Sequence, residues 1–310
     1  MANEGRTIGG TRMMDGSEAT RCVKTMRIRR TGRRFAAAAL GFLICATAVF
    51  ASGDVEGGTY LGVASVDIDT SFLSFEIRGS ASRVVNVEVG RLASNVDVQI
   101  DQRGNGLDIR VTRRFSPFAW RRSDPIVVTV PRDVELEVDA RSASVSISHI
   151  SSDSIRVNTE SGSVRAEDLD GVIRLSASSG SVRLQGAAGS ADVSTSSGSI
   201  TITGFDGDID AAASSGSVKV SDATGRMVAK TSSGSIRLED FRATGNCTFE
   251  SSSGSIYADF LNPKAALRFE LQASSGSIRA FEQRASRTLM VGGGDIVISG
   301  KSKSGSQRYE

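Results

Sequence analysis

A series of cationic residues recurs along the chain at regular intervals and could bind anions. Arg165, Arg183, Lys219, Arg237 and Arg279 each stand three residues after the glycine of a Ser-Gly-Ser segment. If the chain brought these side chains into one row, they would attract the phosphate, sulfate or carboxylate groups of a polysaccharide, a teichoic acid or a lipid headgroup. The spacing therefore indicates a basic stripe on one face.

Neighbouring carboxylates support a second interpretation of the same series. Cross-strand and diagonal ion pairs are ordinary on a sheet face, so the cations could simply be neutralised by their neighbours. Acidic residues at the next outward positions are Glu167, Asp168, Asp222, Glu239, Asp240 and Asp259. Both interpretations need a fold that places equivalent residues of successive repeats side by side.

A second candidate binding segment is the basic, aromatic stretch Arg113–Ser123. Its candidate residues are Arg114, Phe118, Trp120 and Arg121, and Trp120 is the only tryptophan in the chain. An exposed loop of this composition could contact a membrane interface or stack on sugars while its arginines contact phosphate. Alternatively, its aromatic side chains could fold over the end of the domain as a cap.

The carboxylates give little support for catalysis. A polysaccharide lyase or hydrolase built on parallel strands needs clustered carboxylates or an Arg or Lys base. The best candidates are Asp206, Asp208 and Asp210, with Glu167 and Asp168 nearby. Asp206 and Asp208 flank a glycine, however, where aspartate is an ordinary turn residue. Insertions long enough to build a cleft are also missing, and we predict a protein that is not an enzyme.

Histidine and cysteine usage argues against a cofactor or a metal centre. His149 is the only histidine, which excludes a zinc site built on several imidazoles, and we expect it in a turn. Cys22, Cys45 and Cys247 lack metal-ribbon or redox spacing, and Cys247 falls at an inward position where burial is expected. The 37 basic and 35 acidic residues nearly cancel, so charge indicates no nucleic-acid partner.

The repeat that would position the cations is defined by its glycines. Successive Ser-Gly-Ser segments are spaced 18, 18, 18, 18, 20 and 22 residues apart, and their glycines are Gly162, Gly180, Gly198, Gly216, Gly234, Gly254 and Gly276. Degenerate copies are expected at Ser142–Ile147 and around Gly294. A fixed period of this length indicates a solenoid, here with about eight coils of about 18 residues over residues 142–299.

Within one period the residues alternate as in strands. Apolar residues such as Val182 and Leu184 alternate with outward ones, and a second turn is expected at Gly171, Gly189, Gly207, Gly225 and Gly245. Eighteen residues are too few for a crossover helix, so we predict an all-β fold, a single-chain β-solenoid like a parallel β-helix. A third inward position is expected at Leu169, Ala187, Phe205, Ala223, Phe241 and Leu261.

The Ser-Gly-Ser segments themselves are interpreted as the corners of this solenoid. Glycine would accept a positive φ angle there, and the serines would hydrogen-bond along the stack of identical corners. Ahead of the repeats, residues 53–141 are strand-like but irregular and are expected to form a β-rich lead-in and cap, with a hairpin at Arg103–Gly106. Residues 300–310 are predicted to be a polar C-terminal tail.

The first fifty residues are typical of an export signal. Residues 1–34 are basic, with five arginines in MRIRRTGRR, and residues 1–25 could lie upstream of the true start or be disordered. Residues 35–52 carry no charge and are intermediate in length between a signal-peptide core and a spanning helix. We expect either a signal peptide cleaved after Ala51 or a retained anchor, and both leave the rest of the chain outside the cytoplasm.

The segment VTVPRDVELEVDARSASVSI, followed by tandem S-G-S-[VI] or S-G-D-[VI] coils, resembles the bacterial "putative adhesin" domain family. This family, a domain of unknown function, is itself similar to the head-domain adhesins of other bacteria. The resemblance covers roughly residues 86–298. It implies an extracytoplasmic, often membrane-associated β-solenoid without an assigned enzymatic activity, and no functional residue transfers from it.

Together these features predict an exported, non-enzymatic surface protein. Its partner would be an anionic polysaccharide, a membrane surface or an envelope protein. The alternative is a regulatory accessory protein of the envelope stress response that acts through a protein partner. A carbohydrate-active β-helix enzyme is the least supported interpretation.

Overall fold

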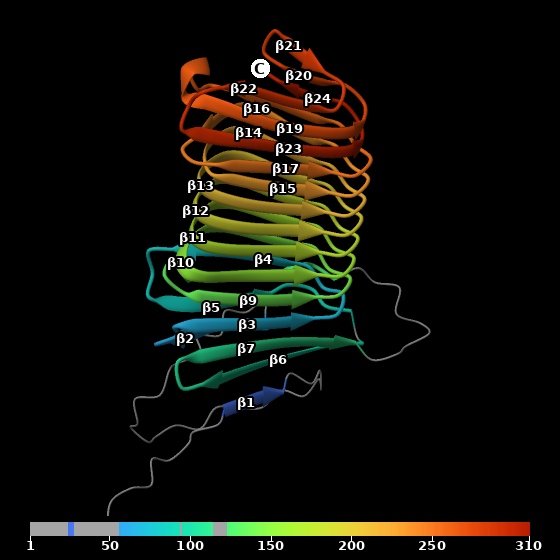
Figure 1. Ribbon diagram of the computed structural model, residues 1–310. Helices are drawn as coiled ribbons and strands as arrows, with labels where there is room; N and C mark the ends of the chain where they lie inside the picture. Colours follow the sequence, from blue (N-terminus) through green and yellow to red (C-terminus); the bar gives the residue numbers. More distant parts are fainter. Residues whose placement is uncertain (1–23, 28–55, 94, 114–122) are drawn as a thin grey trace, which may run out of the picture.

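Parallel strands stack along the long axis of the molecule (Figure 1). The computed structural model describes residues 24–27, 56–93, 95–113 and 123–310. The predicted apolar segment 35–52 and loop residues 114–122 lie outside these ranges. Within the described ranges the helical content is the 3-10 helix η1 (Lys264–Ala266), and none of the helices is both long and apolar enough to span a bilayer.

Four long strands form the regular part of the stack. They are β10 (Val145–Thr159), β11 (Val164–Ala177), β12 (Val182–Thr195) and β13 (Ile200–Ala213). Each pairs in parallel with the next, so that Val182 of β12 lies beside Val164 of β11 and Ile200 of β13. Equivalent residues of successive repeats are therefore neighbours, and the predicted β-solenoid is confirmed.

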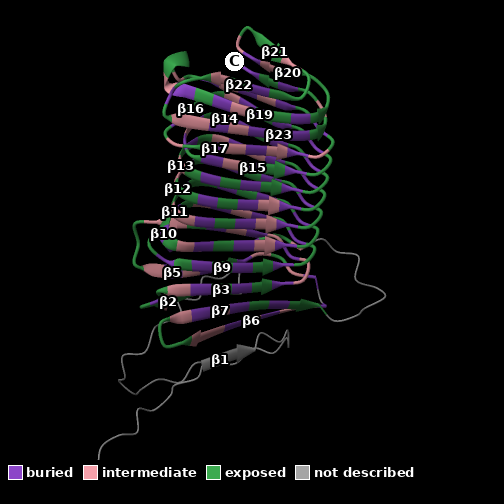
Figure 2. Ribbon diagram, in the orientation of Figure 1, coloured by how far each residue is buried: buried purple, intermediate pink, exposed green. Residues whose placement is uncertain are grey.

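Each coil has three sides. The first side follows the Ser-Gly-Ser corner, as in Val164–Glu167, the second side precedes it, as in Ile173–Ala177, and a short third side joins the two. Buried residues alternate with exposed ones along the strands, giving the purple bands of Figure 2. The third inward position was predicted correctly except at its last member, because Phe260 is 7% exposed whereas Leu261 is 49% exposed.

Glycine has a different role at the Ser-Gly-Ser corners from the one the sequence suggested. None of the six corner glycines from Gly162 to Gly254, all within the described residues, has a positive φ, whereas Gly276 at the corner of the outer coil has the expected positive φ of 119°. A Cβ on Gly180 would instead lie 1.7 Å from the carbonyl oxygen of Gly162 in the preceding coil. Close approach of stacked backbones therefore excludes any side chain. The predicted serine ladder is present, for example where Ser199 N–H donates to Ser181 Oγ at 3.3 Å.

Positive φ angles occur at the two ends of the third side. The turn at its start contains Asp168, with φ of 51°, and its equivalents in other coils include Gly186, Gly204 and Asp222. Its far end contains the predicted second-turn glycines Gly171, Gly189, Gly207 and Gly225, all with positive φ. Gly245 also lies at a bend of the chain, as predicted, although its φ is not positive.

The lead-in strands already belong to the stack. On the second side, β7 (Gly106–Arg113), β3 (Ser65–Thr70), β9 (Glu135–Ala140) and β10 are parallel neighbours in that order. On the first side, β8 (Ile126–Pro131) and β4 (Phe75–Ser80) precede β10 in the same way. Parallel stacking thus begins well before residue 142.

Antiparallel strands cover the N-terminal end of this stack. The predicted hairpin is present between β6 (Val96–Arg103) and β7, and β1 (Lys24–Arg27) pairs with β6. On the first side, β5 (Val84–Val89) is antiparallel to both β8 and β2 (Glu56–Leu61). Covering the end in this way satisfies the edge hydrogen bonds that would otherwise attract another chain.

The stack then continues in chain order through five shorter strands. These strands are β14 (Val218–Gly225), β15 (Met227–Thr231), β16 (Ile236–Ala243), β17 (Cys247–Ser251) and β18 (Ile256–Phe260). After η1, the order of coils in the stack departs from their order in the chain.

The last coil of the chain is inserted between its two predecessors. It consists of β23 (Ile296–Ser304) and β24 (Gln307–Tyr309). β23 lies between β17 and β19 (Leu267–Ser275), and β24 lies between β18 and β20 (Ile278–Ala280). The outer coil is covered by antiparallel β21 (Gln283–Ala285) and β22 (Thr288–Gly292).

Two predictions are wrong in this region. Residues 300–310 are not a tail, because they contribute strands and the fully buried Tyr309. The corner of the last coil is formed by Gly305, which abuts Gly254 O, and not by Gly294. The sequence period places each coil on the one that precedes it in the chain, whereas the last coil is inserted between two earlier ones.

Candidate binding surface

The predicted basic stripe exists on the first side of the solenoid. The cross-strand register aligns Arg165, Arg183, Thr201, Lys219, Arg237 and Tyr257 in one outward row. Arg308 of the inserted coil follows Tyr257, and Arg279 follows Arg308. Sequence reasoning missed Arg308 because it lies in the segment interpreted as a tail.

The C-terminal half of the stripe is neutralised by carboxylates. Glu239 Oε2 lies 3.0 Å from Lys219 Nζ, and Glu239 Oε1 lies 2.6 Å from Arg237 Nε. Hydrogen bonds from Arg237 and then from Lys219 hold the pKa of Glu239 below its usual value. Arg308 is paired in the same way with Glu310. For this half of the stripe, the interpretation as lateral neutralisation was correct.

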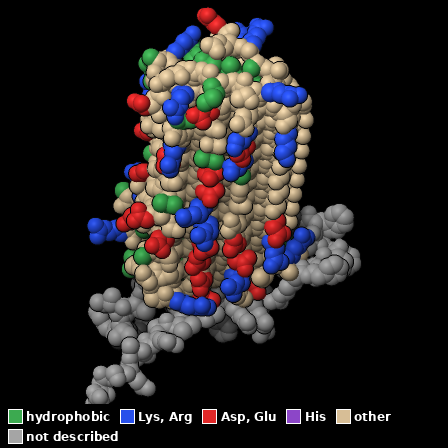
Figure 3. All heavy atoms as spheres, in the orientation of Figure 1, with side chains coloured by type: hydrophobic (Ala, Val, Ile, Leu, Met, Phe, Trp, Pro, Cys, Tyr) green, Lys and Arg blue, Asp and Glu red, His purple; other side chains and the backbone are tan. Residues whose placement is uncertain are grey.

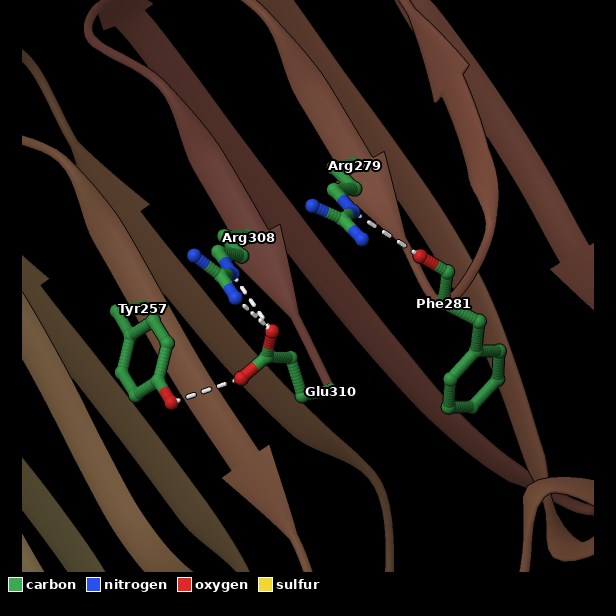
Figure 4. A network of polar contacts seen from close by, with 5 residues as sticks. All are labelled: Tyr257, Arg279, Phe281, Arg308 and Glu310. Atoms are coloured by element: carbon green, nitrogen blue, oxygen red, sulfur yellow. Dashed lines mark hydrogen bonds and ion pairs between the residues drawn. The ribbon is translucent and has the colours of Figure 1, made fainter.

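Tyr257 is held between two cations in this neutralised half. The guanidinium carbons of Arg237 and Arg308 lie 5.0 and 5.8 Å from the centre of its ring, within cation–π range. Figure 4 shows Tyr257 and Arg308 both directed at the Glu310 carboxylate, with the Tyr257 hydroxyl donating at 2.9 Å. Nearby, Arg279 Nε donates to the Phe281 carbonyl at 3.2 Å. These cations are already engaged by protein groups.

Arg165 and Arg183 differ from the rest of the stripe. They are adjacent across β11 and β12, both are exposed, and no carboxylate of the described residues forms an ion pair with either. Both line a hollow of about 730 Å³ whose other lining residues include Ser163, Ser181, Ser199 and Thr201. Glu76, the one acidic residue lining this hollow, is paired with Arg78. This part of the stripe therefore presents two unpaired cations among hydroxyl groups.

The second predicted site, comprising Arg114, Phe118, Trp120 and Arg121, lies outside the described residues. At its borders, the guanidinium of Arg113 lies 5.3 Å from the ring centre of Phe72, and Ser123 Oγ accepts a hydrogen bond from Ala93 N–H at 3.0 Å. The two described residues that flank this segment are thus held by contacts with the lead-in region.

The acidic residues weighed for catalysis do not form a paired site. Asp208 is bound to Arg226 at 2.8 Å, and Asp168 Oδ2 lies 3.1 Å from His149 Nδ1. The pKa of Asp210 is raised by partial burial and by its ladder neighbour Asp192, while Lys230 opposes that rise. In the described part of the chain, no three His, Cys, Asp or Glu residues are grouped so that they could hold a metal ion.

The predicted positions of His149 and Cys247 are correct. His149 lies in the turn that opens the third side, with φ of 60°. Cys247 is a free, buried thiol on the second side, and burial raises its pKa to about 11. Such a thiol remains protonated and behaves as a small apolar side chain.

A family model for the Toastrack DUF4097 domain matches residues 63–310, which include every described coil of the solenoid. The chain belongs to the Toastrack DUF4097 family. The match extends through the inserted last coil, so that coil is part of the Toastrack domain. No curated protein matches the chain.

Several solved structures are distantly similar to this Toastrack chain. A "putative lipid binding protein" from Parabacteroides distasonis is 16% identical, with a TM-score of 0.47, and the match covers 83% of this chain and 98% of that one. A "putative adhesin" from Bacteroides fragilis is 10% identical, with a TM-score of 0.35 and coverage of 84% and 98%. Another from Parabacteroides merdae is 11% identical, with a TM-score of 0.28 and coverage of 83% and 97%. None of these names, nor the family description, refers to an enzymatic activity.

Proposed function

We propose that the chain is an exported, non-enzymatic surface protein that binds an anionic polymer of the cell envelope through Arg165 and Arg183. This proposal rests on the difference in ion pairing between the two halves of the stripe. Lys219, Arg237 and Arg308 have carboxylate partners, whereas Arg165 and Arg183 are unpaired within the described residues. Two exposed cations without partners are available to an external anion.

The geometry suits a chain of repeated anionic groups. Parallel strands are about 4.8 Å apart, so the two guanidinium groups emanate from adjacent rungs and can contact successive groups of one polymer. Arginine offers a planar, two-pronged donor for phosphate or carboxylate oxygens. The hydroxyls of Ser163, Ser181 and Ser199 border the same hollow and supply further hydrogen bonds. Individually weak contacts of this kind become appreciable when they repeat along a polymer.

The location outside the cytoplasm rests on residues 35–52, whose uncharged sequence follows a basic segment. Membership of a family resembling surface adhesins agrees with that location. The regulatory alternative would use a protein partner, and the experiment below distinguishes it.

The test is a sedimentation assay of the purified full chain with peptidoglycan, a capsular polysaccharide or anionic liposomes over a salt series. The variant R165S/R183S removes the unpaired cations, and K219S/R237S removes the same charge from the neutralised half. We expect salt-sensitive binding that R165S/R183S weakens more than K219S/R237S does. Equal effects of the two variants would refute the role of Arg165 and Arg183. Absence of binding to all three materials would refute the polymer proposal and favour a protein partner.

A further inference from the structure

A second concave surface lies on the opposite side of the Ser-Gly-Ser ridge from the stripe. It is a groove of about 920 Å³ that runs along the second side, from the coil of β11 to β22. In Figure 3, which shows this side, a tan surface of backbone and uncharged polar side chains extends along the right of the face, and basic side chains in blue lie above it. The groove thus has an uncharged half and a basic half.

The uncharged half is lined by small, hydroxyl-bearing residues. One outward row contains Ser176, Ser194 and Ala212 on adjacent rungs. The neighbouring corner serines Ser178, Ser196, Ser214 and Ser232 form the other wall. Because these side chains are short, the groove remains open, and its surface offers hydroxyl groups and no large apolar side chain.

The basic half contains four cations. Its lining includes Lys230, Arg287, Lys301 and Lys303, with Glu250 as the single carboxylate. Glu250 is shared, since its oxygens lie 3.8 Å from Lys230 Nζ and 4.0 Å from Lys301 Nζ. Within the described residues, Arg287 and Lys303 form no ion pair. Four positive charges against one negative charge leave an excess of three at this end of the groove.

This cluster depends on the insertion of the last coil. Lys301 belongs to β23, which lies between β17 and β19, and this placement puts Lys301 beside Glu250. Arg287 precedes β22, the strand that covers the outer coil. Residues more than fifty positions apart in the sequence are therefore collected at one end of a continuous groove.

We infer that this groove is a second binding site, specific for an anionic polysaccharide whose acidic group lies among Lys301, Lys303 and Arg287. The inference rests on the proposed function for its ligand class but uses a different surface. A hydrated sugar chain fits the hydroxyl-lined half, because its own hydroxyls can replace water there. An acyl chain would find no apolar wall, and a flat bilayer surface could not enter the hollow. Recognition along several rungs would fix the polymer parallel to the solenoid axis.

The experiment measures binding of the purified full chain to polygalacturonate, neutral dextran and phosphatidylglycerol vesicles at fixed salt. The variant R287S/K301S/K303S removes three cations of the groove. The control R132S/R174S/R242S removes three exposed cations outside both surfaces. Thermal unfolding of each variant verifies the fold. We expect the groove variant to weaken polygalacturonate binding about fivefold to tenfold, because each exposed charge contact contributes little alone, and the control to change it less than twofold.

A substitution without a charge change tests the groove itself. Ala212→Trp places a large ring in the uncharged half, and we expect it to weaken binding of long polygalacturonate more than binding of its short oligomers. Equal effects of the groove variant and its control, or no effect of Ala212→Trp, would overturn the inference. Binding of the wild-type chain to the vesicles but not to polygalacturonate would also overturn it. If R165S/R183S has no effect while the groove variant does, the groove assignment stands and the proposed role of the stripe fails.

Discussion

The hydroxyl of Thr195 connects two coils, since it donates to the Gly180 carbonyl at 3.1 Å and accepts the Gly198 N–H at 3.0 Å. Ala177 and Ala213 occupy the equivalent places in the coils on either side. One buried hydroxyl therefore serves the corners of two successive coils. Thr231 forms the same pair of bonds two coils further on, donating to the Gly216 carbonyl at 3.1 Å and accepting the Gly234 N–H at 3.0 Å.

Thr195→Val should destabilise the solenoid without changing its shape. Valine has the same outline but removes both hydrogen bonds, which leaves a buried N–H and a buried carbonyl unsatisfied. The expected loss in the free energy of unfolding is about 1–3 kcal/mol, measured by urea denaturation. Thr248→Val, at a half-exposed outward position of β17, is the control and should change stability by less than about 0.5 kcal/mol. Equal losses would contradict the proposed sharing.

Gly198→Ala should be strongly destabilising although its backbone is not in the left-handed region. The new Cβ would lie 1.9 Å from the Gly180 carbonyl oxygen, so the stacked backbones must separate. We expect a loss of about 3 kcal/mol or more, at or beyond the usual range for overpacking. Gly293→Ala is the matched control, because no atom lies within 4 Å of the point that its new methyl group would occupy and no positive φ opposes it. A neutral Gly198→Ala variant would disprove the close-approach account.

The buried thiol of Cys247 should make stability fall in alkali. Burial raises its pKa from 9.0 to about 11, so above pH 9 the unfolded chain releases a proton that the folded chain retains. The stabilising contribution is complete below pH 9 and is lost as the pH rises toward 11, by roughly 1–3 kcal/mol. The measurement is the free energy of unfolding from pH 8 to 11 for wild type and Cys247→Ala. The buried Tyr309, whose pKa is also raised, affects both proteins equally, so identical slopes would refute the assignment to Cys247.

Glu239→Gln should increase affinity for an anionic polymer. Glu239 neutralises Lys219 and Arg237, and the amide would leave both cations available beside the Tyr257 ring. We expect binding to become about twofold to fivefold tighter at low salt, with the gain disappearing at high salt as the charges are screened. Glu137→Gln, which frees Arg156 on the second side, is the charge-matched control. Weaker binding by Glu239→Gln would contradict the stripe as a recognition surface.

The sequence was sufficient to predict the β-solenoid, its inward positions and the alignment of Arg165 with Arg183. These features depend on local alternation and on a period that stacks like on like, so residues 18 apart become neighbours. Neutralisation of the stripe was one of two interpretations, but which of its cations are neutralised was not predictable, because Glu239 contacts two cations from different coils. The role of the corner glycines could be determined only from the structure, because a positive φ and a close approach of two backbones both select glycine.

The position of Arg308 and the groove cations could not have been predicted from periodicity. Ser304, Gly305 and Ser306 repeat the corner segment, and that signal could have identified a further coil at the end of the chain. The last coil, however, is inserted between β17 and β19, while β21 and β22 pair with the outer coil. The spacing along the chain defines each repeat but does not determine the order in which the repeats stack.

The insertion of β23 and β24 has a consequence for the order of assembly. A solenoid whose coils stacked in chain order could grow as it is synthesised, one rung after another. Here the strands that complete the stack on both β17 and β19 are translated after those two strands, so β19 has no native parallel neighbour until residues 296–302 emerge. A chain cut before Ile296 would therefore lack an internal rung and not merely an end. The parallel stack between β17 and β19 is complete only when β23 has taken its place between them.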